Sequence, residues 1–133
     1  MPSHVQSTPP SKAAHWTGYV ITALPVILLL LSAVMKFSDS APVSRGFVHY
    51  GIPARIVVPI GIAELVCTVI YLIPCTSVLG AILLSAYLGG ATFTNLRVGD
   101  SFIGPVIVGV LLWGGLFLRD TRLRALIPFR CRQ

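Results

Sequence analysis

The sequence predicts an all-α integral membrane protein: a four-transmembrane-helix bundle with a short interfacial helix between the first and second membrane helices. Of its 133 residues, 55% are hydrophobic and only 11% are charged, and the mean hydropathy is +0.86. An ordinary water-soluble domain cannot carry such a composition on its surface. The apolar residues gather into four runs, at residues 16–36, 55–73, 77–96 and 102–118. Each run approaches the roughly 20 residues that cross a bilayer core of about 30 Å, so the chain has room for four crossings in one domain.

The two ends of the chain differ from this membrane domain. Residues 1–15 are polar and contain two adjacent prolines, Pro9 and Pro10, which predicts a disordered N-terminal tail. Residues 119–133 hold five arginines against one aspartate, which is typical of a basic cytoplasmic tail. Half of the ten basic residues therefore lie beside a hydrophobic segment, so the net charge of +6 predicts an anionic lipid surface as partner rather than nucleic acid.

The first membrane run begins with aromatic residues and ends in a cation. Trp16 and Tyr19 stand where an aromatic belt meets the membrane surface. Five residues along this run recur at three- and four-residue steps, which puts them on one helical face: Thr22, Pro25, Leu29, Ser32 and Lys36.

Residues 37–54 form the longest connection, and their pattern predicts a short amphipathic helix. Pro42 can start this helix, and Gly51 with Pro53 can end it. Val43, Phe47 and Tyr50 share one face, whereas Arg45 and His49 share another. Such a helix can lie on the membrane as a lid over the bundle, or it can be a solvated connector at the interface.

The second run carries one acid near its middle, Glu64, within the apolar stretch PIGIAELVCTVIY. A carboxylate at this depth needs a partner or a proton, because little water can solvate it. Helical phase places the polar and small residues of this run on one side: Gly61, Glu64, Cys67, Thr68 and Tyr71. That side is expected to face protein rather than lipid.

The third run is rich in small residues, and the fourth contains no ionisable residue at all. Small residues spaced four apart let membrane helices approach closely, which predicts helix packing through Ala81, Ser85, Gly89 and Gly90. The ridge of Ala81, Ser85 and Gly89, or the face of the fourth run, can also join two copies in a homodimer. The fourth run is expected to contribute packing. Three scattered cysteines, Cys67, Cys75 and Cys131, show no metal-ligand spacing, so no metal site is predicted.

Four crossings put both termini and the turn at residues 74–77 on one side of the membrane. That side carries six lysines and arginines, and the other carries four. The positive-inside rule therefore predicts that both termini are cytoplasmic.

In this topology several polar residues gather near the outer ends of the helices. The long side chains of Lys36 and Arg97 can reach inward to meet Glu64 directly or through water. We therefore expect an outward-opening polar pocket among the first three membrane helices, built from Lys36, Glu64, Thr92, Asn95 and Arg97. An acid inside a membrane can handle a ligand or a proton, and it can equally serve as a structural ion pair.

The sequence also resembles a known family. The segments that carry the resemblance are VMKF, PIGIAELVCTVIYLIP, VLGAILLSAYLGGATFTNLRVGD and GVLLWGGLFLRDTRLRALIP. They are similar to small bacterial membrane proteins of the DoxX-like family, over nearly everything after the first fifteen residues. The resemblance implies a four-helix bundle in the bacterial inner (plasma) membrane. Its pattern is matched at Lys36, Glu64, Gly89, Gly90, Thr92, Arg97, Gly99 and Asp100, and it departs at Asn95, where many members have histidine.

Two functions are compatible with these observations. One is a non-enzymatic membrane subunit or small-molecule binding protein, which needs only the polar pocket and no cofactor. The other, suggested by the family, is a membrane subunit of a quinone-linked oxidoreductase or oxidative-stress complex. There Glu64 and a nearby cation would transfer protons and a partner would supply the redox centre. The chain shows no catalytic constellation of its own, so the first function is favoured.

Overall fold

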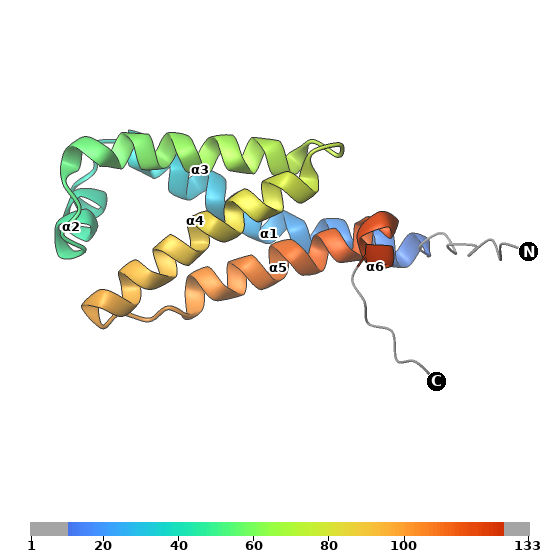
Figure 1. Cartoon of the computed structure of the whole chain (residues 1–133). Helices are drawn as coiled ribbons and strands as arrows, with labels where there is room; N and C mark the ends of the chain where they lie inside the picture. The colour runs from blue at the N-terminus through green and yellow to red at the C-terminus, as the bar shows by residue number, and fades with distance from the viewer. Residues whose placement is uncertain (1–10, 127–133) are drawn as a thin grey trace, which may run out of the picture.

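The computed structural model describes residues 11–126, and this part of the chain contains helices and no strand. In chain order the elements are α1 (Lys12–Phe37), α2 (Ala41–His49), the short 3₁₀ helix η1 (Ala54–Ile56), α3 (Val57–Leu72), α4 (Ser77–Val98), α5 (Ile103–Arg119) and α6 (Thr121–Leu126) (Figure 1). A short helix thus occurs between the first two apolar runs, where the sequence predicts one. Most of the predicted N-terminal tail, and the last seven residues of the basic tail, lie outside the described residues.

Both ends of the helical domain extend further than the hydropathy pattern predicts. The first helix begins at Lys12 instead of residue 16, because the Ser11 hydroxyl accepts a hydrogen bond from the Ala14 amide at 3.2 Å and caps it. At the other end, the Asp120 carboxylate accepts hydrogen bonds from two amides of α6, at 2.8 and 3.3 Å. Local capping therefore makes helix out of residues that composition alone assigns to tails.

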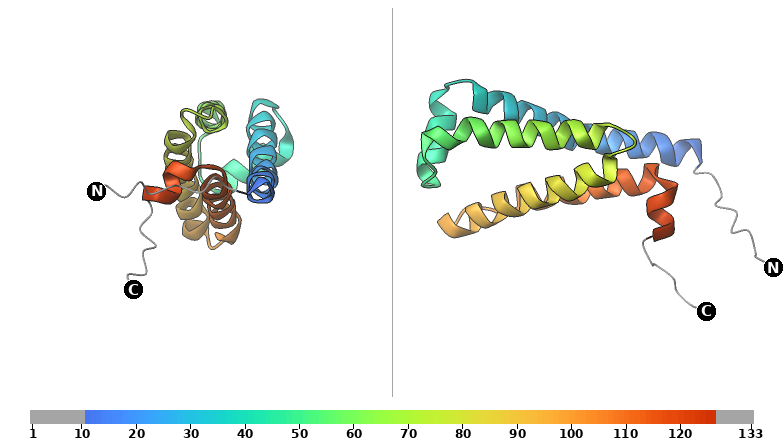
Figure 2. Two further views of the ribbon diagram at one scale, coloured as in Figure 1. Left: turned by 90° about the vertical axis from the view of Figure 1, so that its right-hand side faces the viewer. Right: turned by 45° about the horizontal axis from the view of Figure 1, so that its top comes forward.

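The long helices form a ring of neighbours. Helix α1 packs against α3 and α5, and α4 packs against α3 and α5 in turn. Figure 2 shows this ring end-on and also from the side, where the pair α1/α3 and the pair α4/α5 meet near α6 and diverge toward α2. Helix α2 lies across the wide end (Figure 1).

Three segments are long and apolar enough to cross a membrane: α1, the continuous stretch Ala54–Leu72, and α4. Helix α5 is also apolar but has only 17 residues. Residues 11–126 thus form an all-helical domain with three helical segments long enough to span a membrane and one shorter apolar helix.

Close helix contacts occur at glycines, but at other glycines than the sequence predicts. A Cβ atom on Gly80 would collide with the backbone of Tyr71, and one on Gly115 would collide with the hydroxyl of Thr22. By contrast, a Cβ on Gly89 or Gly90 would meet nothing within 4 Å, so these two residues make no close helix contact within the described part of the chain. Gly89 instead lines a groove between α4 and α5, and Gly90 lines the space between the two helix pairs.

The other two residues of the predicted ridge do contact neighbouring helices. Ala81 is buried in the core. The Ser85 hydroxyl accepts a hydrogen bond from the Trp113 indole on α5 at 2.7 Å. The buried apolar side chains that form the core are Val26, Leu29, Tyr71, Ala81, Leu84, Leu88, Leu112, Leu116 and Leu123.

The narrow end is also held by an arginine. The Arg119 guanidinium lies over the rings of Tyr19 and Tyr71, 5.2 and 5.5 Å from their centroids, and so joins α1, α3 and α5. The buried Tyr71 hydroxyl donates to the carbonyl of Leu112 at 2.7 Å. Tight packing at this end leaves the space between the helix pairs to open at the other.

Candidate functional site

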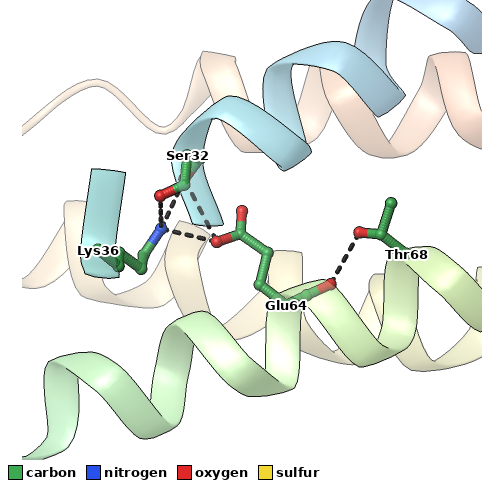
Figure 3. A network of polar contacts seen from close by, with 4 residues as sticks. All are labelled: Ser32, Lys36, Glu64 and Thr68. Atoms are coloured by element: carbon green, nitrogen blue, oxygen red, sulfur yellow. Dashed lines mark hydrogen bonds and ion pairs between the residues drawn. The ribbon is translucent and has the colours of Figure 1, made fainter. Parts of the chain in front are cut away.

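An ion pair inside the bundle joins α1 to α3. The Lys36 ammonium nitrogen lies 2.7 Å from Glu64 Oε2, and only 1% of the Glu64 residue is exposed (Figure 3). Lys36 stands in the last turn of α1 and Glu64 near the middle of α3. The helices approach closely here because Gly61, one turn before Glu64, has no side chain: a Cβ there would lie 3.0 Å from the Cβ of Lys36.

Ser32 completes the hydrogen bonding of this pair. Its hydroxyl lies 3.3 Å from Glu64 Oε2, and it accepts a hydrogen bond from the Lys36 ammonium at 2.5 Å (Figure 3). The same ammonium also donates to the Ser32 carbonyl at 3.3 Å. Lys36 therefore has an acceptor for each of its three protons, as a buried ammonium requires. Ser32 shares a helical face with Lys36 in the sequence, but the pattern gave no reason to include it in the site.

The ion pair lies in the wall of a cavity of about 660 Å³ between the two helix pairs. Its polar wall residues are Ser32, Lys36, Tyr50, Glu64, Tyr87, Thr94 and Asn95, and its apolar wall residues are Leu28, Leu29, Phe47, Ile52, Ile60, Ala86, Leu88, Gly90, Ala91, Pro105 and Val108. Residues of the α2 region line it as well, so the cavity extends to the wide end. The cavity involves α5 too, through two apolar residues.

Three of the five predicted pocket residues line this cavity, namely Lys36, Glu64 and Asn95. Thr92 instead lines a second groove of about 600 Å³ between α4 and α5, and its hydroxyl donates to the carbonyl of Leu88 at 2.8 Å. The helical phase of α4 explains this separation: Tyr87, Ala91 and Asn95 recur at four-residue steps on the cavity side.

Arg97, the fifth predicted residue, reaches away from the acid. Its guanidinium donates to the backbone carbonyl of Tyr50, the residue that ends α2. Nearby, His49 Nε2 lies 3.0 Å from Asp100 Oδ2. These two contacts tie the end of α2 to the end of α4 and the turn that follows it, beside the mouth of the cavity.

Backbone conformation supports this junction on both sides. Gly51 and Gly99 adopt positive φ values of 67° and 80°, a region that favours glycine. Gly99 ends α4 in the left-handed conformation, and the amide of Asp100 then bonds back to the carbonyl of Asn95 at 2.9 Å.

The pKa of the Tyr50 phenol is raised at this junction. Burial raises the pKa of its phenol, and the negative charge of Asp100 together with a hydrogen bond to that carboxylate raises the pKa further. Tyr50 therefore keeps its proton to a higher pH than a solvated tyrosine.

Besides Ser32, three polar residues of the cavity wall lie outside the predicted pocket, namely Tyr50, Tyr87 and Thr94. Tyr87 lies eight residues before Asn95, and this spacing puts both on one face of α4. Tyr50 belongs to the apolar face of the amphipathic segment at residues 37–54. Both carry a hydroxyl that an apolar pattern search does not register.

Within residues 11–126, no group of three or more His, Cys, Asp or Glu side chains gathers as metal ligands do. Cys67 and Cys75 are free thiols in this part of the chain, and Cys131 lies outside the described residues.

Comparison with known protein families identifies the family of this chain. The family model of the DoxX-like family matches residues 20–115. This range runs from α1 into α5 and includes every residue that lines the cavity. No curated protein and no solved structure matches the chain significantly.

Proposed function

Because the chain belongs to the DoxX-like family, and because its apolar helices make it a multi-pass membrane protein, we propose that it is a non-enzymatic membrane protein that binds a small amphipathic molecule. The observation that carries this proposal is the cavity that holds the Lys36–Glu64 ion pair. Its size falls within the range of about 300 to 1,000 Å³ that is usual for ligand pockets. Mostly apolar walls with a few convergent polar groups are also typical of such pockets.

The proposal includes four crossings of a bacterial inner membrane. Helix α5 has 17 residues and so spans about 26 Å, a little less than the hydrocarbon core of about 30 Å. Its packing beside α1 and α4 supports a fourth crossing, because modest local thinning of the bilayer accommodates a short helix. The excess of basic residues at the termini favours a cytoplasmic location for both, which turns α2 and the cavity mouth outward.

The Lys36–Glu64 ion pair favours ligand binding over catalysis as the function of the cavity. Lys36 and Ser32 hold the carboxylate of Glu64 in one position, as the polar anchor of a binding site is held. A quinone-linked subunit would place its quinone in the same cavity, so the identity of the bound molecule separates the two functions.

The test is to purify the protein in mild detergent, extract any bound molecule and identify it by mass spectrometry. The variant Ala91→Trp places a large side chain in the cavity. Phe93→Trp enlarges a side chain at an exposed position of the same helix and serves as the control. We expect an amphipathic molecule to accompany the wild-type protein and Phe93→Trp, and to be lost from Ala91→Trp. A quinone recovered in this pattern would favour the oxidoreductase subunit. Equal recovery from both variants would contradict binding in the cavity.

A further inference from the structure

We propose that the head group bound in this cavity is uncharged and donates a hydrogen bond to Glu64, as an alcohol or a primary amide does. This inference rests on the proposed binding function and specifies the chemical class of the ligand. It follows from the charges, the hydrogen bonds and the apolar wall of the cavity.

The charge of the cavity wall is balanced. Lys36 and Glu64 are the two residues of the described wall that carry charge at neutral pH, and they form an ion pair of 2.7 Å. A charged head group would add an uncompensated charge beside Glu64, which is 1% exposed. Burying such a charge is strongly unfavourable unless a partner of opposite sign is available. Both opposite-sign partners in this wall are already bound to each other, so an uncharged head group is favoured.

The hydrogen bonds of the pair distinguish a donor from an acceptor. The three protons of the Lys36 ammonium point to the Ser32 carbonyl, the Ser32 hydroxyl and Glu64 Oε2. Both side-chain bonds that the Glu64 carboxylate accepts within this network end on Oε2, and Figure 3 shows the other oxygen turned away from Lys36. A carboxylate oxygen only accepts hydrogen bonds, so the ligand group that meets Oε1 must donate.

Further wall residues complete the recognition. The hydroxyl of Tyr87 and the amide of Asn95 lie on the α4 side of the same cavity. Each can accept as well as donate, so they can satisfy the remaining hydrogen bonds of the head group. Most of the rest of the wall is apolar and comes from the α2 region as well as from α1, α3, α4 and α5, so that an alkyl chain is buried favourably there.

The experiment compares four probes with the same alkyl chain: decanol, decyl methyl ether, decanoate and decylammonium. Binding to the protein in phosphatidylcholine nanodiscs is measured against the cavity-filled variant Ala91→Trp, which corrects for partition into lipid. We expect decanol to bind wild-type protein about tenfold more tightly than the ether, the effect of one hydrogen bond to a charged group. We also expect it to bind more tightly than either ion.

Charge-altered variants give an independent readout. In Glu64→Gln the unpaired Lys36 should move the preference to decanoate, and in Lys36→Met the unpaired Glu64 should move it to decylammonium. The double variant should again favour the uncharged probes. If a variant does not fold, the wild-type probe series still decides.

The outcomes separate the two proposals. If wild-type protein binds decanoate, decylammonium or the ether best, the binding function stands and the head-group class is wrong. If no probe binds wild-type protein better than Ala91→Trp does, the binding function itself is overturned.

Discussion

Gly80 on α4 lies directly against the backbone of Tyr71 on α3, with no room for a Cβ atom between them. This contact follows the short turn between the two helices and fixes their closest approach. Because α4 diverges from α3 beyond this point, the same contact determines where the cavity can open. Tight packing at one end and open space at the other are thus two consequences of one arrangement.

Replacement of Gly80 by alanine should destabilise the fold by about 1 to 3 kcal/mol, as overpacking of a close contact does. The measurement is the free energy of unfolding in mixed micelles titrated with dodecyl sulfate. Gly89→Ala is the matched control, because its Cβ would meet nothing within 4 Å. The control should be neutral or slightly stabilising, since alanine favours helix over glycine by up to about 1 kcal/mol. Equal stability of the two variants would contradict the close contact.

We expect the loss of one member of the Lys36–Glu64 pair to destabilise the fold more than the loss of both. Removing either partner alone leaves a buried charge without compensation, which typically costs about 3 to 5 kcal/mol. The double variant Lys36→Met/Glu64→Gln should recover most of that loss in the same unfolding titration. Arg55→Gln, at an exposed position, controls for loss of a cation. Additive losses in the double variant would show that the two side chains stabilise the fold independently.

Much of the fold can be predicted from the sequence because hydropathy and turn residues act locally. Four apolar runs predict the four longer helices, and Pro42 lies in the first turn of α2 as expected. Gly51, predicted to help end that helix, adopts the positive φ that the turn needs. The exact start of α1 could not be predicted, since it depends on a single capping hydroxyl from Ser11.

The site was less predictable because it depends on how helices are rotated relative to one another. The periodicity of α3 places Glu64 on a protein-facing side, but it does not choose between Lys36 and Arg97 as its partner. Thr92 lies only three residues from Asn95, yet it faces a different groove. Likewise, the rows of small residues that include Gly89 and Gly90 indicate helices that can approach, whereas in the fold Gly89 lines the groove between α4 and α5 and Gly90 lines the cavity.

Tyr50 should report on the junction between α2 and the α4–α5 turn. Its pKa is raised in the folded protein, first by burial and then by Asp100, so the folded state holds the phenol proton more strongly than the unfolded state. The resulting stabilisation is fully present below the unfolded pKa of about 10 and is lost as the pH rises through the folded pKa. Asp100→Asn should lower the pH at which Tyr50 ionises, although burial should keep it above that of a solvated tyrosine.

The measurement for Tyr50 is phenolate absorbance during an alkaline titration, with the curve of Tyr50→Phe subtracted to isolate this residue. Asp39→Asn, an exposed aspartate before α2, is the control and should leave the titration unchanged. An unaltered curve in Asp100→Asn would mean that the carboxylate does not act on the phenol.

The proposed membrane orientation can be tested with a maleimide that does not cross membranes. Cys75 lies exposed in the turn between α3 and α4, Ser101 lies exposed between α4 and α5, and Arg122 lies exposed on α6. In a Cys131→Ser background, intact cells should label Ser101→Cys, and Cys75 should react only after the membrane is opened. In a background that also lacks Cys75, Arg122→Cys should behave as Cys75 does, because α5 returns the chain to the cytoplasmic side.

Labelling of both introduced cysteines in intact cells would instead mean that α5 does not cross the membrane. Labelling of Cys75 in intact cells would reverse the orientation and turn the cavity mouth toward the cytoplasm.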